Sequence, residues 1–269
     1  MKMADLFSAI FRVLKMPVAV IVLCTACSYP HMYHSPNMMS VPLFTKSGEI
    51  SLMPAASFGT VNTCFELQAA LALPGHIGTG VNYMTGGKNN SGDTYDDFSE
   101  YNYFEGFGGL YASFKNIGVF EIYAGYGEGR ENHTFAFNDW DWGGGDWVQD
   151  GSAEMKFSRF FIQPDIGVRT KNIEGAFSIR FSQVQFKDIK FRDTYYRFDE
   201  LTDLDKNRTS FLIEPGFTFR GGHDPLKFQI QFLFSPNLTN PQQDFEHFRF
   251  NMGVNIKFGG KKDNIQPSP

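Results

Sequence analysis

The feature that most constrains the fold is an unbroken alternation near the end of the chain, over residues 248–258. Every second residue, ending at Phe258, is apolar, and the residues between them are polar or glycine. Such a segment is a β-strand with one apolar and one polar face. The segments 208–220 and 226–235 repeat the pattern. Repeated strands of this kind are typical of a transmembrane β-barrel, with lipid on one side and a polar lumen on the other. A soluble β-sandwich is the alternative.

Composition agrees with a membrane barrel. The 269 residues include 30 Phe, 11 Tyr and 27 Gly, which suit many turns and aromatic girdles at the membrane interfaces. No run of about 18 apolar residues follows the leader, so no helical membrane span is predicted. The net charge of −5 argues against nucleic acid as a partner, because nucleic-acid binding needs a cationic surface.

The first 26 residues have the pattern of an export signal. A basic stretch leads into the apolar residues 16–23, and small residues then precede Cys27. This arrangement resembles the lipobox of bacterial lipoproteins, which implies that Cys27 is acylated and becomes the mature N-terminus. Cys24 stands where that family usually has Leu, and a plain secretory signal is the alternative.

Residues 27–46 contain several prolines and are predicted to form an extended periplasmic tether. The stretch Tyr33–Ile50 resembles the start of a family of bacterial outer-membrane β-barrel lipoproteins of uncharacterised function (outer membrane protein beta-barrel domain-like). The resemblance implies an outer-membrane location and a barrel fold, and it carries over no catalytic residues. We expect the barrel over 47–258 and a disordered tail over 259–269.

Ten antiparallel strands are predicted, with eight as the fallback. Short turns alternate with long polar links at 87–100, 130–153 and 188–207. Bacterial outer-membrane barrels have short periplasmic turns and long extracellular loops, so both termini are expected in the periplasm. The expected strands are 48–58, 63–73, 76–86, 101–114, 118–129, 154–169, 173–187, 208–220, 226–235 and 246–258.

Strand parity predicts a set of charged residues facing the lumen. A ten-stranded barrel is narrow enough for side chains to fill, so these charges should pair across it. We interpret them as a polar plug, and a narrow path for small solutes or cations is the alternative. The residues are Glu66, Glu121, Asp165, Arg180, Glu214, Arg220, Lys227, Arg249 and Lys257.

No enzymatic activity and no cofactor are predicted. A barrel hydrolase, the second alternative, would need a histidine beside a carboxylate near the outer rim. Only His133, close to Glu131, and His247, next to Glu246, are expected there. We interpret Cys64 as a small strand residue without chemistry.

One loop, 138–150, partly matches a calcium-binding pattern. Asp139, Asp141, Asp146 and Asp150 supply carboxylates, and a divalent cation is therefore a possible partner. A solvated acidic loop is the other interpretation.

The remaining expected partners are the lipid of the outer membrane and, during biogenesis, the barrel-assembly machinery. Outer-membrane barrels resembling this one end on the aromatic residue that this machinery reads. Phe258 is the candidate here, although the chain continues to residue 269.

Overall fold

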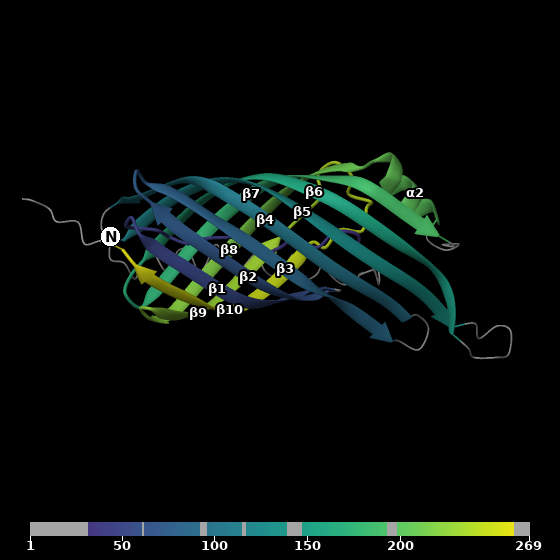
Figure 1. The fold of residues 1–269 in the computed structure, drawn as a ribbon, viewed down its shortest axis with the longest axis horizontal. Helices are drawn as coiled ribbons and strands as arrows, with labels where there is room; N and C mark the ends of the chain where they lie inside the picture. The colour runs from purple at the N-terminus through teal and green to yellow at the C-terminus, as the bar shows by residue number, and fades with distance from the viewer. Residues whose placement is uncertain are drawn as a thin grey trace, which may run out of the picture. The chain divides into compact units, whose positions relative to one another are not determined.

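Ten antiparallel strands close into a barrel in the computed structural model (Figure 1), which describes residues 32–60, 62–91, 96–114, 117–138, 147–192 and 198–260. Each strand pairs with its neighbours in the chain, and β1 closes the ring by pairing with β10. The prediction of a closed ten-stranded barrel is confirmed, whereas the eight-stranded fallback and the sandwich are wrong. The strands are β1 (Glu49–Gly59), β2 (Thr63–Leu73), β3 (Ile77–Ser91), β4 (Asp96–Phe114), β5 (Gly118–Asn138), β6 (Trp147–Arg169), β7 (Ile173–Arg192), β8 (Thr209–His223), β9 (Leu226–Phe234) and β10 (Phe248–Gly259).

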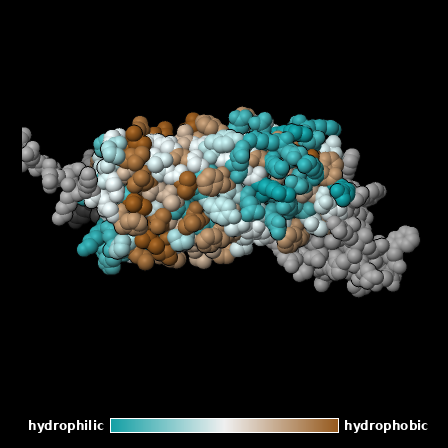
Figure 2. All heavy atoms as spheres, in the orientation of Figure 1, coloured by the Kyte–Doolittle hydropathy of each residue, from teal (hydrophilic) through white to brown (hydrophobic). Residues whose placement is uncertain are grey.

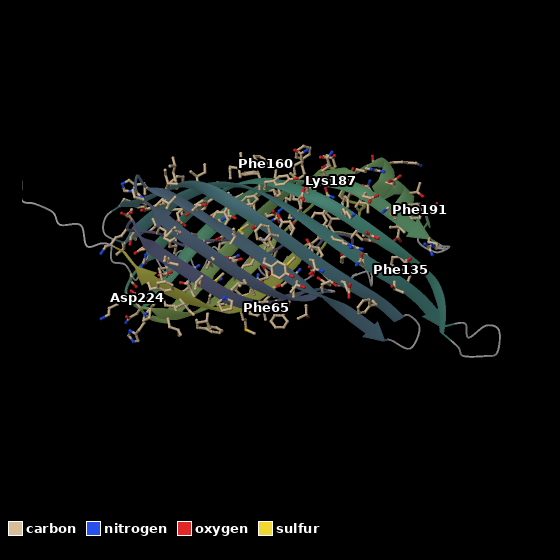
Figure 3. All side chains as sticks on the ribbon, viewed as in Figure 1. Phe65, Phe135, Phe160, Lys187, Phe191 and Asp224 are labelled. Atoms are coloured by element: carbon tan, nitrogen blue, oxygen red, sulfur yellow. The ribbon has the colours of Figure 1, made fainter. Side chains whose placement is uncertain are left out.

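The two ends of the barrel differ. The turn end carries the short connections β2–β3, β4–β5, β6–β7 and β8–β9, together with the end of β10 at Gly259. The opposite end, here the hairpin end, carries the other connections and a helix, α2 (Phe198–Lys206). Figure 3 shows Asp224 at the turn end and Phe135 and Phe191 toward the hairpin end. No helix within the described ranges is long and apolar enough to cross a membrane.

The wall is taller on one side than on the other. Strands β4 to β7 have 19 to 23 residues, whereas β1, β2, β9 and β10 have 9 to 12. The extra length occupies much of the links that we predicted to be loops. β3 and β4 pair as far as Ser91, β5 and β6 pair as far as Asn138, and β7 reaches Arg192. The prediction of three long loops is therefore wrong for most of their residues.

An apolar belt surrounds the half of the barrel nearer the turn end. On β6 the outward side chains of Phe160, Ile162 and Ile166 are 49%, 43% and 54% exposed. The other strands repeat this, and Figure 2 shows brown hydrophobic residues gathered on the visible face of this half of the barrel. A contiguous apolar surface of this extent is unfavourable in water and stable against acyl chains. The belt therefore marks the part of the wall that lies in a membrane.

Above the belt, the polarity of the two faces of each strand is reversed. Beyond Phe160 on β6, the outward residues become Lys156 and Glu154, and the inward residues become Phe157 and Met155, both buried. The inward side chains of the tall wall join Leu201 and Leu204 of α2 in one apolar cluster. This part of the barrel is built like a soluble protein, with an apolar interior and a charged exterior. The sequence analysis missed these parts of the strands because polar outward residues resemble those of a loop.

A substitution inside the belt tests the membrane boundary. Ile162→Arg should lower the free energy of unfolding by about 2–4 kcal/mol in lipid vesicles, because the guanidinium would face acyl chains. Thr134→Arg, on an outward position of β5 beyond the belt, is the matched control and should change it little. Urea titration in vesicles measures both variants. Equal effects would contradict the position of the belt.

Candidate functional site: the occupied lumen

The lumen is occupied by the chain's own N-terminal segment, residues 32–46. Residues 32–44 are all buried. Backbone bonds hold Tyr33 to Asp244 at the hairpin end (N–O 2.7 Å) and Gly48 to Ala72 at the turn end (N–O 2.7 Å). The segment therefore runs through the barrel from one end to the other. The prediction that it forms a periplasmic tether is wrong for residues 32–44, because these residues are buried in the lumen. Wall side chains there form the hydrogen bonds that water would form with an exposed tether.

Wall side chains satisfy the backbone N–H groups of this lumen segment. Glu121 accepts from both Leu43 N (3.0 Å) and Phe44 N (2.8 Å). Glu66 accepts from Met38 N at 2.8 Å. Because a buried, unpaired backbone N–H is costly, these carboxylates substitute for a neighbouring strand.

The carbonyl groups of the segment are bonded in the same way. Arg180 donates to Asn37 O (2.9 Å), and Gln163 donates to Ser40 O (2.8 Å). Gln231 binds Met39 on both sides, accepting from its N–H (2.9 Å) and donating to its carbonyl (3.2 Å). Further donors to carbonyl oxygens are Gln68 and Asn82 to Met38, Arg220 to Val41 and Arg169 to Leu43.

Glycines let the segment approach the wall closely. A Cβ at Gly216 would lie 2.8 Å from Met39 Sδ, and a Cβ at Gly167 would lie 2.8 Å from Leu43 Cδ2. A Cβ at either position would force the Met39 or the Leu43 side chain to move. Leu43 itself has a φ of 52°, which is unusual for a branched residue and is held by the bonds to Glu121 and Arg169.

A buried cluster of four charges surrounds Asn37. Arg180 makes a two-pronged pair with Glu214 (Nε–Oε2 2.7 Å, Nη2–Oε1 3.0 Å), and Arg159 pairs with Glu105 at 2.7 Å. The Asn37 side chain donates to Glu105 (2.7 Å) and accepts from both arginines. All five residues are at most 1% exposed. Paired and hydrogen-bonded charges are the form in which such groups are stable in an interior.

A second cluster lies toward the turn end and centres on Glu174. Its carboxylate pairs with Arg220 (2.8 Å), Lys227 (2.9 Å) and Lys257 (3.1 Å). Arg220 also donates to Val41 O at 2.5 Å. One carboxylate therefore ties β7, β8, β9 and β10 together and fixes the arginine that holds the lumen segment.

All nine residues that we placed in the lumen are buried and line it, each at most 5% exposed. Their pairing differs from the predicted ion pairs across the lumen. Arg180 and Glu214 face each other on adjacent strands, Arg249 pairs with Glu246 (2.7 Å), and Glu66 and Glu121 bind the lumen segment instead. Asp165 accepts from Gln163 at 3.1 Å.

Sequence reasoning missed Glu105, Glu174 and Asn37. Parity on β4 and β7 could have found the two glutamates, because each lies on the inward face of its strand. Nothing in the sequence marks Asn37 as an interior residue, since prolines on both sides suggest an exposed, extended chain.

Removing the carboxylate of Glu121 should weaken the barrel. Glu121→Ala leaves the N–H groups of Leu43 and Phe44 without their acceptor, and we expect a loss of about 2–4 kcal/mol in the free energy of unfolding. Glu128→Ala is the matched control on the same strand, because Glu128 points outward and its bonds to Lys187 and Tyr126 are exposed to solvent. Unfolding in detergent measures both variants. A control variant as unstable as Glu121→Ala would contradict this role.

The two histidines expected near the outer rim lie in different surroundings. His133 faces the interior, where its Nε2 lies 3.1 Å from Glu131 and its ring stacks on Phe135. His247 lies in the β9–β10 connection, and its neighbour Glu246 pairs with Arg249 instead. His133 and Glu131 are buried, at 4% and 0% exposure, so substrate has no access to the pair.

Other predicted residues are only partly covered by the described chain. Cys27, Asp139, Asp141 and Asp146 lie outside it, and for Asp150 only the backbone, in β6, is described. Cys64 is a buried free thiol packed in the apolar cluster of the tall wall. Phe258 is an outward residue of β10 opposite Ile50 and is 45% exposed.

The space beside the middle of the lumen segment is small. The cavity next to Ser40, Val41 and Pro42 has a volume of about 10 Å³, which is room for one water molecule. A larger, open groove of about 330 Å³ lies on the outer surface between Phe104, Arg130 and Lys187. The described lumen is therefore packed along the middle of the segment.

Comparisons with known proteins give similarity at the level of the fold. No family model and no curated protein matches the chain. Among solved structures, the outer membrane protease OmpT from Escherichia coli has a TM-score of 0.46 at 9% identity, covering 83% of this chain and 99% of its own. The β domain of the Bordetella autotransporter BrkA has a TM-score of 0.42 at 9% identity, covering 78% and 98%. The KdgM porin has a TM-score of 0.36 at 11% identity, covering 77% and 99%.

Proposed function

We propose that this protein is a non-enzymatic outer-membrane β-barrel that its own N-terminal segment keeps closed. The hairpin end, with α2 and the tall wall, faces the outside and presents a polar surface to a partner. The turn end faces the periplasm, and Cys27 carries a lipid. The observation that carries the proposal is the lumen segment, which occupies the space that a channel would use.

The exterior supports the presenting role. Above the apolar belt, the tall wall exposes oppositely charged side chains in pairs, such as Lys187 with Glu128 (2.6 Å) and Arg130 with Glu154 (3.0 Å). Figure 2 shows this region as a teal patch next to the belt. Exposed ion pairs contribute little to stability, so a surface this rich in charge suits solvent or a polar partner.

Two alternative functions are a narrow channel for small solutes or cations, and a barrel hydrolase. The channel would require the lumen segment to leave or to shift, because its backbone is bonded to the wall from Met38 to Phe44. The hydrolase would require access to the buried His133 and Glu131. Neither requirement is met in this arrangement of the chain.

Planar-bilayer recording tests the proposal. The intact protein should insert and give no conductance steps. The variant with a replaced lumen segment, described in the Discussion, is the positive control for insertion. Steps of the same size from the intact protein would overturn the closed barrel in favour of the channel.

A further inference from the structure

One surface groove on the tall wall lies where the apolar belt ends and charged residues begin. It has a volume of about 330 Å³ and is lined by side chains from β3 to β7, among them Phe104, Arg130, Lys156 and Lys187. We propose that this groove binds the phosphorylated headgroup of a membrane lipid, whose acyl chain lies on the belt beside it. The inference goes beyond the presenting role proposed above, and it does not depend on whether the barrel conducts.

The groove lies at the height where lipid headgroups meet the wall. On β6, Phe160 belongs to the belt, and Lys156 is the first charged residue on the outward face beyond it. Tyr126 is the partner of Phe160 in the register of β5 and β6, and its hydroxyl accepts from Lys187 Nζ at 2.9 Å. Figure 3 shows Lys187 beyond Phe160, toward the hairpin end. Since aromatic residues border the hydrocarbon region of a barrel, an occupant of the groove is level with the headgroups of that leaflet.

The cations of the groove are arranged for a shared anion. Arg130 and Lys156 are direct partners in the register of β5 and β6, and like charges at such positions repel each other. Their side chains are 53% and 49% exposed, so both can turn toward one ligand. Lys187 precedes Asp188, the register partner of Lys156 on β7. A phosphate among these three cations would remove the repulsion and accept charge-assisted hydrogen bonds from each of them.

Two of the cations are paired with exposed carboxylates and keep further donors. Lys187 binds Glu128 (2.6 Å) and Tyr126 (2.9 Å), which use two of the three donors of its ammonium group. Arg130 pairs with Glu154 at 3.0 Å and has five N–H groups in all. Exposed pairs of this kind contribute little to stability, so a phosphate can join them or replace the carboxylates at small cost.

Lys156 is the cation that is held most loosely. Its Nζ is 3.9 Å from the carboxylate of Asp188, which is too far for a hydrogen bond. That carboxylate lies closer to Lys190, at 3.2 Å. The ammonium of Lys156 can therefore bind an anion in the groove without giving up a hydrogen bond to Asp188.

Beside the groove, the belt contains a strip of wall without projecting side chains. Gly106 and Gly108 are outward positions of β4 that follow Phe104, and a Cβ at either would meet no atom closer than 3.9 Å. Ala124 is the register partner of Gly108 on β5. Phe104 and Leu110 project at the two ends of the strip, at 55% and 56% exposure. An acyl chain that extends from a headgroup in the groove can lie on this strip and contact the backbone closely.

Native mass spectrometry of the protein purified in detergent tests the headgroup site. Phosphatidic acid is the probe, and phosphatidylcholine with the same acyl chains is the reference. Lys156→Gln combined with Lys187→Gln should weaken phosphatidic acid binding about twentyfold, because each cation near a membrane surface contributes about fivefold. Lys171→Gln combined with Lys206→Gln removes the same charge at the turn end and from α2, and should change binding little. Equal weakening by the two pairs, or equal retention of the two lipids by the unmodified protein, would overturn the site.

The strip and the source of the phosphate are tested separately. Gly108→Leu should weaken phosphatidic acid binding about fourfold, the effect of one methylene that loses its contact. Gly175→Leu, at an outward glycine of β7 near the turn end, is the matched control. Glycerol 3-phosphate should not displace the lipid. Displacement would assign the groove to a soluble phosphate ester, and a Gly108→Leu variant that binds like the control would remove the acyl chain from the strip. Either result overturns the proposal.

These variants leave the lumen unchanged. The substituted side chains lie on the outer surface, and Lys156, Lys187 and Gly108 have no bond to the lumen segment. Heat-modifiable gel migration selects the variants that fold. Each folded variant should remain closed in planar-bilayer recording, so a failure of lipid binding and a failure of the closed barrel are distinguished.

Discussion

Replacing residues 33–44 with a Gly-Ser linker of equal length should convert a non-conducting barrel into a conducting one. The linker cannot form the Asn37 contacts or fill the lumen with side chains, and a flexible chain leaves water along the wall. The wall charges would remain, since Glu174 still pairs with Arg220, Lys227 and Lys257. Planar-bilayer recording should then show discrete steps where the intact protein shows none.

A synthetic peptide with the sequence of residues 33–44 provides the control for this variant. Added to the conducting variant, it should reduce the steps, because the wall donors and acceptors match its backbone. A scrambled peptide of the same composition should not. A linker variant that folds, as judged by heat-modifiable migration, and yet stays closed would show that the segment does not seal the lumen.

Arg180→Met should lower the free energy of unfolding by about 3–5 kcal/mol, because it leaves Glu214 as a buried carboxylate without its two-pronged partner. Arg159 Nη1 is 4.0 Å from Glu214 and is already bonded to Glu105, so it compensates only in part. The substitution also removes the donor to Asn37 O. Urea unfolding in detergent, followed by tryptophan fluorescence, measures the loss.

The double variant Arg180→Met with Glu214→Gln is the control for the buried charge. A neutral amide in place of the carboxylate removes the unpaired charge, so the double variant should recover at least half of the lost stability. If both variants are equally unstable, the loss comes from packing or from the contact with Asn37 and not from the charge of Glu214.

Within the membrane, the sequence predicts the fold well. In the belt each strand has one face that contacts lipid and one that faces the lumen, so alternation follows from the two environments and is clearest on β7 to β10. The pattern therefore revealed ten strands, their approximate bounds and the nine inward charged residues. It failed above the belt, where β5 and β6 continue with polar residues on the outward face and apolar residues on the inward face. When the outward residues are polar and the inward residues are partly polar, the alternation of apolar and polar residues is too weak to distinguish a strand from a polar link.

The sequence by itself determined which side chains face lipid and which face the lumen, because each strand residue's environment depends on its own parity. Only the tertiary structure decided what fills that lumen. Asn37, Met38 and Leu43 are held by Arg180, Glu66 and Glu121, which are between 28 and 143 residues away in the chain. Those partners come together only when the ring closes, since the bonds run between a segment without regular pairing and side chains from many strands. Local patterns report on neighbours along one strand, and they carry no information about a chain that crosses the barrel.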